Sequence, residues 1–251
     1  VQYFARPFLE NGIAVHSAWA ANGVPVAEYT FAQIVLATKG FFHRLHKPGS
    51  GYVWTNRNIY VDFPGNYDVT VGIIGAGMIG KMVIERLHRD LDGVRVVVFD
   101  PFLSDTAAAE LRVEKCSLEE LFAQSDVISN HLANNPQTVG MLNARLFDRM
   151  KPNTTFINTG RGAQIVEADM IAALRADPSR AAVLDVTYPE PPREDSPLYT
   201  LDNVYLTPHI AGSLGNEVRR MGEYMLSEYR HVAAGEETKY GVTLKMLETM
   251  A

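Results

Sequence analysis

The sequence predicts an α/β fold in which a doubly wound parallel sheet carries helices on both faces. Short apolar runs, typical of buried strands, alternate with amphipathic segments of helical period through most of the 251 residues. Polar or titratable side chains follow several of these runs directly, and such side chains bind ligands at the carboxyl edge of a parallel sheet. A fold of this class therefore places its functional residues just after its strands.

The first part of the chain predicts one strand, one helix and a long loop. A short strand is expected at 12–15. A helix is expected at 26–42 because Phe31, Ile34, Val35 and Thr38 recur at helical spacing on one face. From 43 to 67 the pattern gives way to Pro, Gly and aromatic residues, which favour a loop.

A glycine cluster then follows the apolar run 69–74. The cluster has the spacing G-x-G-x-x-G and consists of Gly75, Gly77 and Gly80. Gly75 permits a tight turn, Gly77 lets a pyrophosphate approach the backbone, and Gly80 allows close packing of helix on strand. A helix beginning near Met78 would direct its positive end at the phosphates. The context of strand, turn and helix predicts a Rossmann-type dinucleotide site.

The second apolar run, 94–99, ends at Asp100, which lies 20 residues beyond Gly80. An acid in this position accepts hydrogen bonds from the ribose 2′- and 3′-hydroxyls. Because a 2′-phosphate would meet the carboxylate, the sequence favours NAD over NADP.

Beyond Asp100 the alternation of strands and helices continues to the end of the chain. Lys151-Pro152 is expected to end the helix at 143–150, since proline does not continue a helix. Further strands are expected at 127–130, 155–158, 181–185 and 204–206. Further helices are expected at 117–123, 167–176 and 215–234.

Composition narrows the class of protein. Hydrophobic residues at 47% and charged residues at 21% are ordinary for a soluble globular chain. A net charge of −6 argues against nucleic acid or an anionic membrane as the main partner. The one cysteine, Cys116, forms no internal disulfide and is interpreted as a small buried side chain. No metal site is indicated, and a cytoplasmic protein is expected.

Three side chains match the needs of a nicotinamide enzyme that acts on a hydroxy or keto acid. Arg161 offers a planar fork that binds a carboxylate bidentately. His209 supplies a proton donor and acceptor for the carbonyl oxygen, and Glu190 would orient it. Taken singly, these residues also fit a surface ion pair, a turn residue and a solvated acid. His131, which ends the strand 127–130, is interpreted as structural.

Three segments resemble the signature blocks of the D-isomer-specific 2-hydroxyacid dehydrogenases, the family of phosphoglycerate, glycerate and D-lactate dehydrogenases. They are 158–162, 184–191 and 206–212, and they follow the glycine fingerprint in the family's order. The resemblance implies reversible hydride transfer between NAD(H) and a small D-2-hydroxy acid/2-keto acid pair. It also implies that Arg161 binds the substrate carboxylate, that His209 is the acid/base and that Glu190 is its partner.

The same resemblance implies the cofactor contacts. Asp185 would hold the nicotinamide carboxamide, while Thr159 and Gly160 would line the cofactor. The whole predicted set comprises Gly75, Gly77, Met78, Ile79, Gly80, Asp100, Leu132, Thr159, Gly160, Asp185, His209, Ala211 and Gly212. A homodimer is expected, with the helix at 26–42 either a dimerisation element or a plain core helix. The loop after His131 departs from the family pattern at Ala133-Asn134.

The resemblance also predicts the domain organisation. Residues 1–20 are expected to be a remnant of a flavodoxin-like substrate domain, 21–212 the Rossmann domain, and 213–251 a helix and tail that return to the substrate domain. Family members usually extend further at the N-terminus, so the chain is expected to lack part of the substrate domain and to bind NAD better than it turns over substrate.

Two alternatives stay open at the level of sequence. An NAD-sensing protein of the co-repressor kind would retain the same Arg, Glu and His, and an inactive fragment would bind NAD only. A formate dehydrogenase-like enzyme is disfavoured, because Glu190 stands where that branch typically has glutamine.

Overall fold

The computed structural model describes residues 4–45 and 63–248, and its centre is a seven-stranded parallel sheet. In sheet order the strands are β4 (Glu114–Lys115), β3 (Arg95–Phe99), β2 (Thr70–Ile74), β5 (Val127–Asn130), β6 (Thr155–Asn158), β7 (Ala181–Leu184) and β8 (Val204–Leu206). All neighbouring pairs are parallel. The strand order reverses between β2 and β5, and the crevice at such a switch point is where ligands bind in this architecture.

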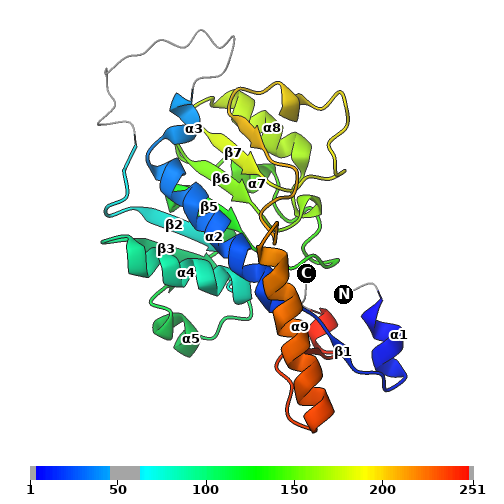
Figure 1. Cartoon of the computed structure of the whole chain (residues 1–251). Coiled ribbons are helices and arrows are strands. Elements are labelled where there is room, and N and C mark those ends of the chain that lie inside the picture. The colour runs from blue at the N-terminus through cyan, green and yellow to red at the C-terminus, as the bar shows by residue number, and fades with distance from the viewer. Residues whose placement is uncertain (1–3, 46–62, 249–251) are drawn as a thin grey trace.

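Helices cover both faces of this sheet, as Figure 1 shows. The face that carries Val71 and Ile73 packs against α2 (Trp19–Thr38) and α4 (Met78–Asp90). The opposite face packs against α6 (Leu118–Gln124), α7 (Ala144–Phe147) and α8 (Glu167–Ala176). Side chains alternate between the faces along each strand, so one sheet builds two cores. The predicted doubly wound α/β fold is confirmed.

An aromatic cluster anchors the second core. Phe122 of α6, Phe147 of α7 and Phe156 of β6 are fully buried. The rings of Phe147 and Phe156 meet edge to face with centroids 5.2 Å apart, a favourable geometry for aromatic pairs. This packing holds β6 against the helices on that face of the sheet, and β6 leads directly into the candidate site.

The predicted helix at 26–42 differs from the observed one. Helix α2 begins earlier, at Trp19, and contains Pro25 in its interior. It ends at Thr38, and Gly40, at φ 68°, separates it from α3 (Phe41–Arg44). Proline lacks an N–H group and is unfavourable inside a helix, but the buried side chains on either side of Pro25 keep this helix continuous. Most of the loop predicted at 43–67 lies outside the described residues.

Several short elements are missing from the sequence prediction. They are α1 (Ala5–Glu10), α5 (Asp105–Glu110), β4 and β9 (Gly241–Val242). Both residues of β4 are exposed, so they show no apolar run. The strand predicted at 12–15 is β1 (Val15–His16), which pairs antiparallel with β9. Because this pairing joins segments from the two ends of the chain, the local sequence around each strand does not predict it.

The last long helix, α9 (Glu217–Ala234), lies beside α2 and leads to β9. His16 Nδ1 lies 2.8 Å from Glu228 Oε2, which also accepts the backbone N–H of Tyr240. Ala5, Val242 and Leu247 form a small separate core nearby. Among the described residues, no helix combines the length and apolar character required to cross a membrane.

Candidate active site

The turn from β2 into α4 carries the glycine fingerprint, and each glycine meets a different constraint. A Cβ on Gly80 would lie 2.1 Å from the Gly75 carbonyl oxygen. Gly75 has φ +91°, and a Cβ there would lie 2.9 Å from the carbonyl oxygen of His131. A Cβ on Gly77, in contrast, would meet no protein atom within 4 Å. The protein therefore requires Gly75 and Gly80 for its own packing, while Gly77 leaves open space at the start of a helix.

That helix start is suited to an anion. Gly77 is the N-cap of α4, and no side chain caps the helix there. The first N–H groups of a helix lack intrahelical partners and lie at the positive end of its dipole. The turn thus offers backbone donors, positive potential and space, which is what a pyrophosphate needs. Asp100 lies beside it, because its Oδ2 accepts the Ala76 N–H at 2.7 Å.

His131 follows β5 at the same edge of the sheet. Its Nε2 lies 2.9 Å from Ser129 Oγ, and burial lowers the pKa of its imidazole to about 4. The ring therefore stays neutral near pH 7. This environment agrees with the structural role predicted for His131.

Asp185, just after β7, organises the turn that carries His209. Its Oδ1 accepts the hydroxyl of Thr207 at 2.6 Å and the N–H of Ile210 at 2.8 Å. Its Oδ2 accepts the N–H of Ala211 at 2.9 Å. Asp185 is 2% exposed, so these bonds satisfy a charge that burial would otherwise disfavour. The Asp185 side chain therefore holds this turn in place. Its contact with the nicotinamide stays a prediction.

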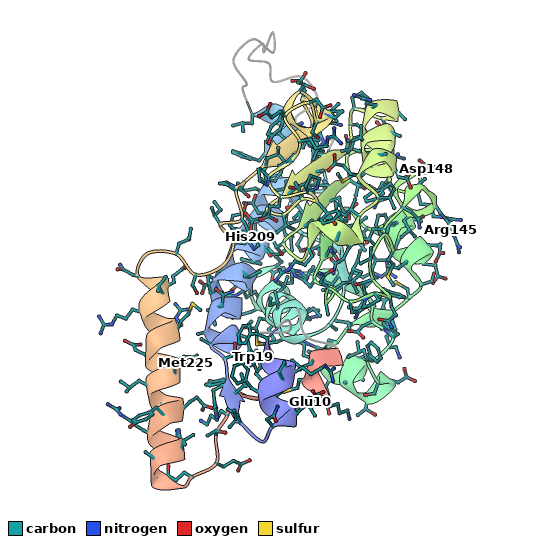
Figure 2. The ribbon with its side chains drawn as sticks, turned by 90° about the vertical axis from the view of Figure 1, so that its right-hand side faces the viewer. Glu10, Trp19, Arg145, Asp148, His209 and Met225 are labelled. Atoms are coloured by element: carbon teal, nitrogen blue, oxygen red, sulfur yellow. The ribbon has the colours of Figure 1, made fainter. Side chains whose placement is uncertain are left out.

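His209 and Glu190 meet at this edge. The Nδ1 of His209 lies 2.6 Å from Oε1 of Glu190, and the two side chains are 48% and 41% exposed. Glu190 comes from a loop between Pro189 and Pro191, and His209 from the turn after β8. Figure 2 shows His209 between the sheet and the start of α9. The sequence predicted this pairing across 19 residues of chain.

Arg161 follows β6 at the same edge but does not join that pair. Its Nη1 donates to the carbonyl oxygen of Gly160 at 2.7 Å. A Cβ on the next residue, Gly162, would lie 2.0 Å from the backbone of Thr187, so the arginine turn packs tightly on the loop that leads to Glu190. The structure thus gathers the three predicted catalytic residues on adjoining loops, with Arg161 hydrogen-bonded separately.

Sequence reasoning missed the part that helix α2 plays here. The hydroxyl of Tyr29 lies 2.9 Å from Thr207 Oγ1, and Thr30 Oγ1 lies 3.1 Å from Thr159 Oγ1. Asn22 Oδ1 accepts the N–H of Ser213 at 2.8 Å. Thr30 is fully buried although polar. A threonine within an otherwise apolar helix face is the one signal in the sequence for such a contact.

Comparison with known proteins places these features in context. Residues 34–211 match the sequence model of the family described as D-isomer specific 2-hydroxyacid dehydrogenase, NAD binding domain. The chain is 38% identical over 228 residues to a D-3-phosphoglycerate dehydrogenase of Mycobacterium tuberculosis, a match that covers 90% of this chain and 42% of the relative. With the enzyme of that name from Archaeoglobus fulgidus, identity is 30% over 95% of this chain and 44% of the relative. The chain therefore spans less than half the length of these curated relatives.

Solved structures share the fold. The TT0316 protein of Thermus thermophilus superposes with a TM-score of 0.75 at 29% identity, covering 96% of this chain and 75% of that one. A D-mandelate dehydrogenase of Rhodotorula graminis gives a TM-score of 0.81 at 23% identity, covering 95% and 71%. At that level of identity the second likeness concerns the fold alone.

Proposed function

Because this chain belongs to the D-isomer-specific 2-hydroxyacid dehydrogenase family, we propose that it takes part in NAD-linked hydride transfer between a D-2-hydroxy acid and its 2-keto acid. The observation that carries the proposal is the 2.6 Å contact between His209 and Glu190 at the edge of the sheet that holds the glycine turn. Family membership confirms the predicted dinucleotide cofactor as NAD. The dehydrogenase names of the relatives do not favour the co-repressor-like alternative.

The cofactor would lie along the carboxyl edge of the sheet. The glycine turn would take its pyrophosphate, Asp100 its adenosine ribose, and Thr159 and Gly160 would line its other half. NAD, when bound, supplies the hydride acceptor or donor of the reaction. The space over Gly77 and the uncapped start of α4 support this fit.

His209 would move the proton of the reaction. Glu190 engages Nδ1, so Nε2 is the ring nitrogen left to face a substrate oxygen. During reduction of a keto acid, Nε2 would donate a proton to the carbonyl oxygen, and during oxidation it would accept one. The Glu190 carboxylate fixes the tautomer and stabilises the imidazolium form.

Arg161 would bind the substrate carboxylate. The guanidinium carries five N–H donors in a planar fork, and the bond to Gly160 uses only part of that capacity. A cation at this point would also draw electron density from the neighbouring carbonyl group and assist hydride addition.

The experiment is a turnover assay of the purified protein with NADH and a panel of 2-keto acids. We expect the consumption of NADH to match the formation of a 2-hydroxy acid, with the D enantiomer as product on chiral chromatography. NADH binding at micromolar concentrations without turnover of any keto acid in the panel would contradict the proposal. An L product would contradict the assigned stereochemistry.

A further inference from the structure

Three buried amide side chains form a cluster beneath the candidate site. Asn130 ends β5, Asn158 ends β6, and Gln164 closes the short 3₁₀ helix at Gly162–Gln164. Each is 0% exposed. A buried amide is unfavourable unless its hydrogen-bonding groups are satisfied, so the partners of this amide cluster indicate what it holds.

The cluster joins two neighbouring strand ends. Asn130 and Asn158 are register partners on adjacent parallel strands. The Nδ2 of Asn130 donates to Asn158 Oδ1 at 3.0 Å and to Gln164 Oε1 at 2.6 Å. The Nε2 of Gln164 donates to the carbonyl oxygens of Leu132 at 2.8 Å and Ala133 at 3.0 Å. Gln164 therefore ties the loop after β5 to the end of β6.

These bonds admit one orientation of each amide. Gln164 Nε2 faces two carbonyl oxygens, which accept but do not donate, so the amino group must point that way. Its Oε1 then faces Asn130, whose amino group must point toward Gln164 and Asn158. The Oδ1 of Asn130 is left to accept the N–H of Leu132, at 3.2 Å. A fully satisfied network of this kind rigidifies its surroundings.

The same cluster holds the backbone of Arg161 from both sides. The Arg161 N–H donates to Gln164 Oε1 at 3.3 Å, and Asn158 Nδ2 donates to the Arg161 carbonyl oxygen at 3.2 Å. Gly160 also packs on the cluster, because a Cβ there would lie 3.0 Å from Gln164 Oε1 and 3.1 Å from Asn130 Nδ2. The position of Arg161 is thus set by amides that do not reach the surface.

We propose that Gln164 is a positioning residue for this site: it fixes Arg161 relative to the loop that begins at Leu132. The inference rests on the proposed function, which gives Arg161 the substrate carboxylate, and on the cofactor contact that the family resemblance implies for Leu132. Gln164 touches neither ligand, and it acts by holding the two binding elements in one relative arrangement.

The test compares three variants of the protein. Gln164→Met keeps the length of the side chain but removes its hydrogen bonds. The double variant Asn130→Leu/Gln164→Met replaces both partners of the 2.6 Å hydrogen bond by apolar side chains, which offsets part of the stability that the single change loses. Ser125→Ala is the matched control, because it removes a buried hydrogen bond of 2.7 Å to Leu121 at the opposite end of β5.

Hydrogen exchange measured by mass spectrometry and steady-state kinetics are the two readouts. In Gln164→Met we expect exchange to quicken at least tenfold in segments 130–135 and 158–162, with a fall of at least tenfold in kcat/KM for the keto acid. In the double variant the Tm should recover in part while exchange and kcat/KM do not. The control should change neither segment.

A kcat/KM that recovers together with the Tm would overturn the inference, since a merely structural role predicts that result. Unchanged exchange at 158–162 in Gln164→Met would overturn it as well. If the unaltered protein turns over no 2-keto acid, the proposed function fails, and the exchange of the two segments still decides whether Gln164 holds Arg161.

Discussion

His209 adopts a left-handed backbone conformation, with φ 54°. A non-glycine residue in this region is uncommon, and the surrounding structure must hold it there. Asp185 does so, because its own carbonyl oxygen accepts the His209 N–H and its carboxylate accepts the N–H groups of the next two residues. The sequence predicted the chemistry of His209 from its place after a strand. It could not predict this support, which comes from residues more than 20 positions away.

Asp100 carries the predicted preference for NAD. Its carboxylate is anchored by the N–H groups of Ala76 and Phe102, and a 2′-phosphate beside it would be repelled. Asp100→Asn keeps the shape and removes the charge, so the ratio of the Kd for NADPH to that for NADH should fall by at least about tenfold. Fluorescence titration of both cofactors measures the ratio. An exposed neighbour, changed as Asp105→Asn, should leave it unaltered.

His131 makes stability depend on pH. Its pKa is lowered by burial to about 4, whereas an unfolded histidine titrates near 6.5, so between these values the unfolded chain binds a proton that the native chain does not. The free energy of unfolding should therefore rise with pH across this window, by on the order of 3 kcal/mol for this residue, and level off above it.

Urea denaturation of His131→Gln at pH 7 and pH 4.5 tests this slope. The variant should lose less stability on acidification than the unaltered protein. Burial also lowers the pKa of His43 and of His88, so part of the slope should remain. His231→Gln on α9 is the control and should keep the full slope. Equal slopes for all three proteins would show that His131 does not carry the effect.

At the scale of elements, we expect two glycines of the β2–α4 turn to serve different ends: Gly80 the stability of the fold, and Gly77 the binding of the cofactor. Gly80→Ala places a Cβ 2.1 Å from the Gly75 carbonyl oxygen and should lower the free energy of unfolding by about 2–3 kcal/mol. Gly77→Ala meets no protein atom, and its φ of −68° suits alanine, so stability should stay within about 1 kcal/mol. Its Cβ would nevertheless lie in the path of the pyrophosphate.

Urea denaturation and NADH fluorescence titration distinguish the two variants. We expect Gly77→Ala to fold normally and to raise the Kd for NADH at least tenfold. Tight NADH binding by a stable Gly77→Ala protein would mean that the pyrophosphate does not approach this glycine.

The elements differ in how far local sequence predicts them. Strands β2, β3, β5, β6 and β7 are buried apolar runs, and their period and length determine them without knowledge of the fold. The prediction missed the start of α2, which contains Pro25, a residue typical of helix boundaries. The packing of α2 on α4 and on the sheet keeps the helix continuous through this proline. Tyr29 and Thr30 lie within the predicted helix, but their contacts with Thr207 and Thr159 join residues more than 120 positions apart, so the local sequence does not indicate them.

At the scale of the molecule, a parallel sheet brings the carboxyl ends of strands that are distant in the sequence to one edge. Residues that directly follow β2, β3, β5, β6 and β7 meet there, so the candidate site could be predicted from the strand ends. The contacts between the two ends of the chain could not, since the pairing of β1 with β9 and of His16 with Glu228 joins distant segments that carry no matching pattern. The division at residues 20 and 212 stays a prediction.

The His209–Glu190 pair on this edge is the centre of the proposed function, and one variant tests it most directly. His209→Asn removes the imidazole and retains a residue that tolerates the left-handed backbone. We expect NADH still to bind, with a Kd measured by fluorescence that changes far less than kcat, while kcat for the keto acid falls about 10²- to 10⁴-fold, the contribution of a general acid. Turnover retained in His209→Asn, or loss of NADH binding in parallel with turnover, would contradict the proton-transfer role of His209.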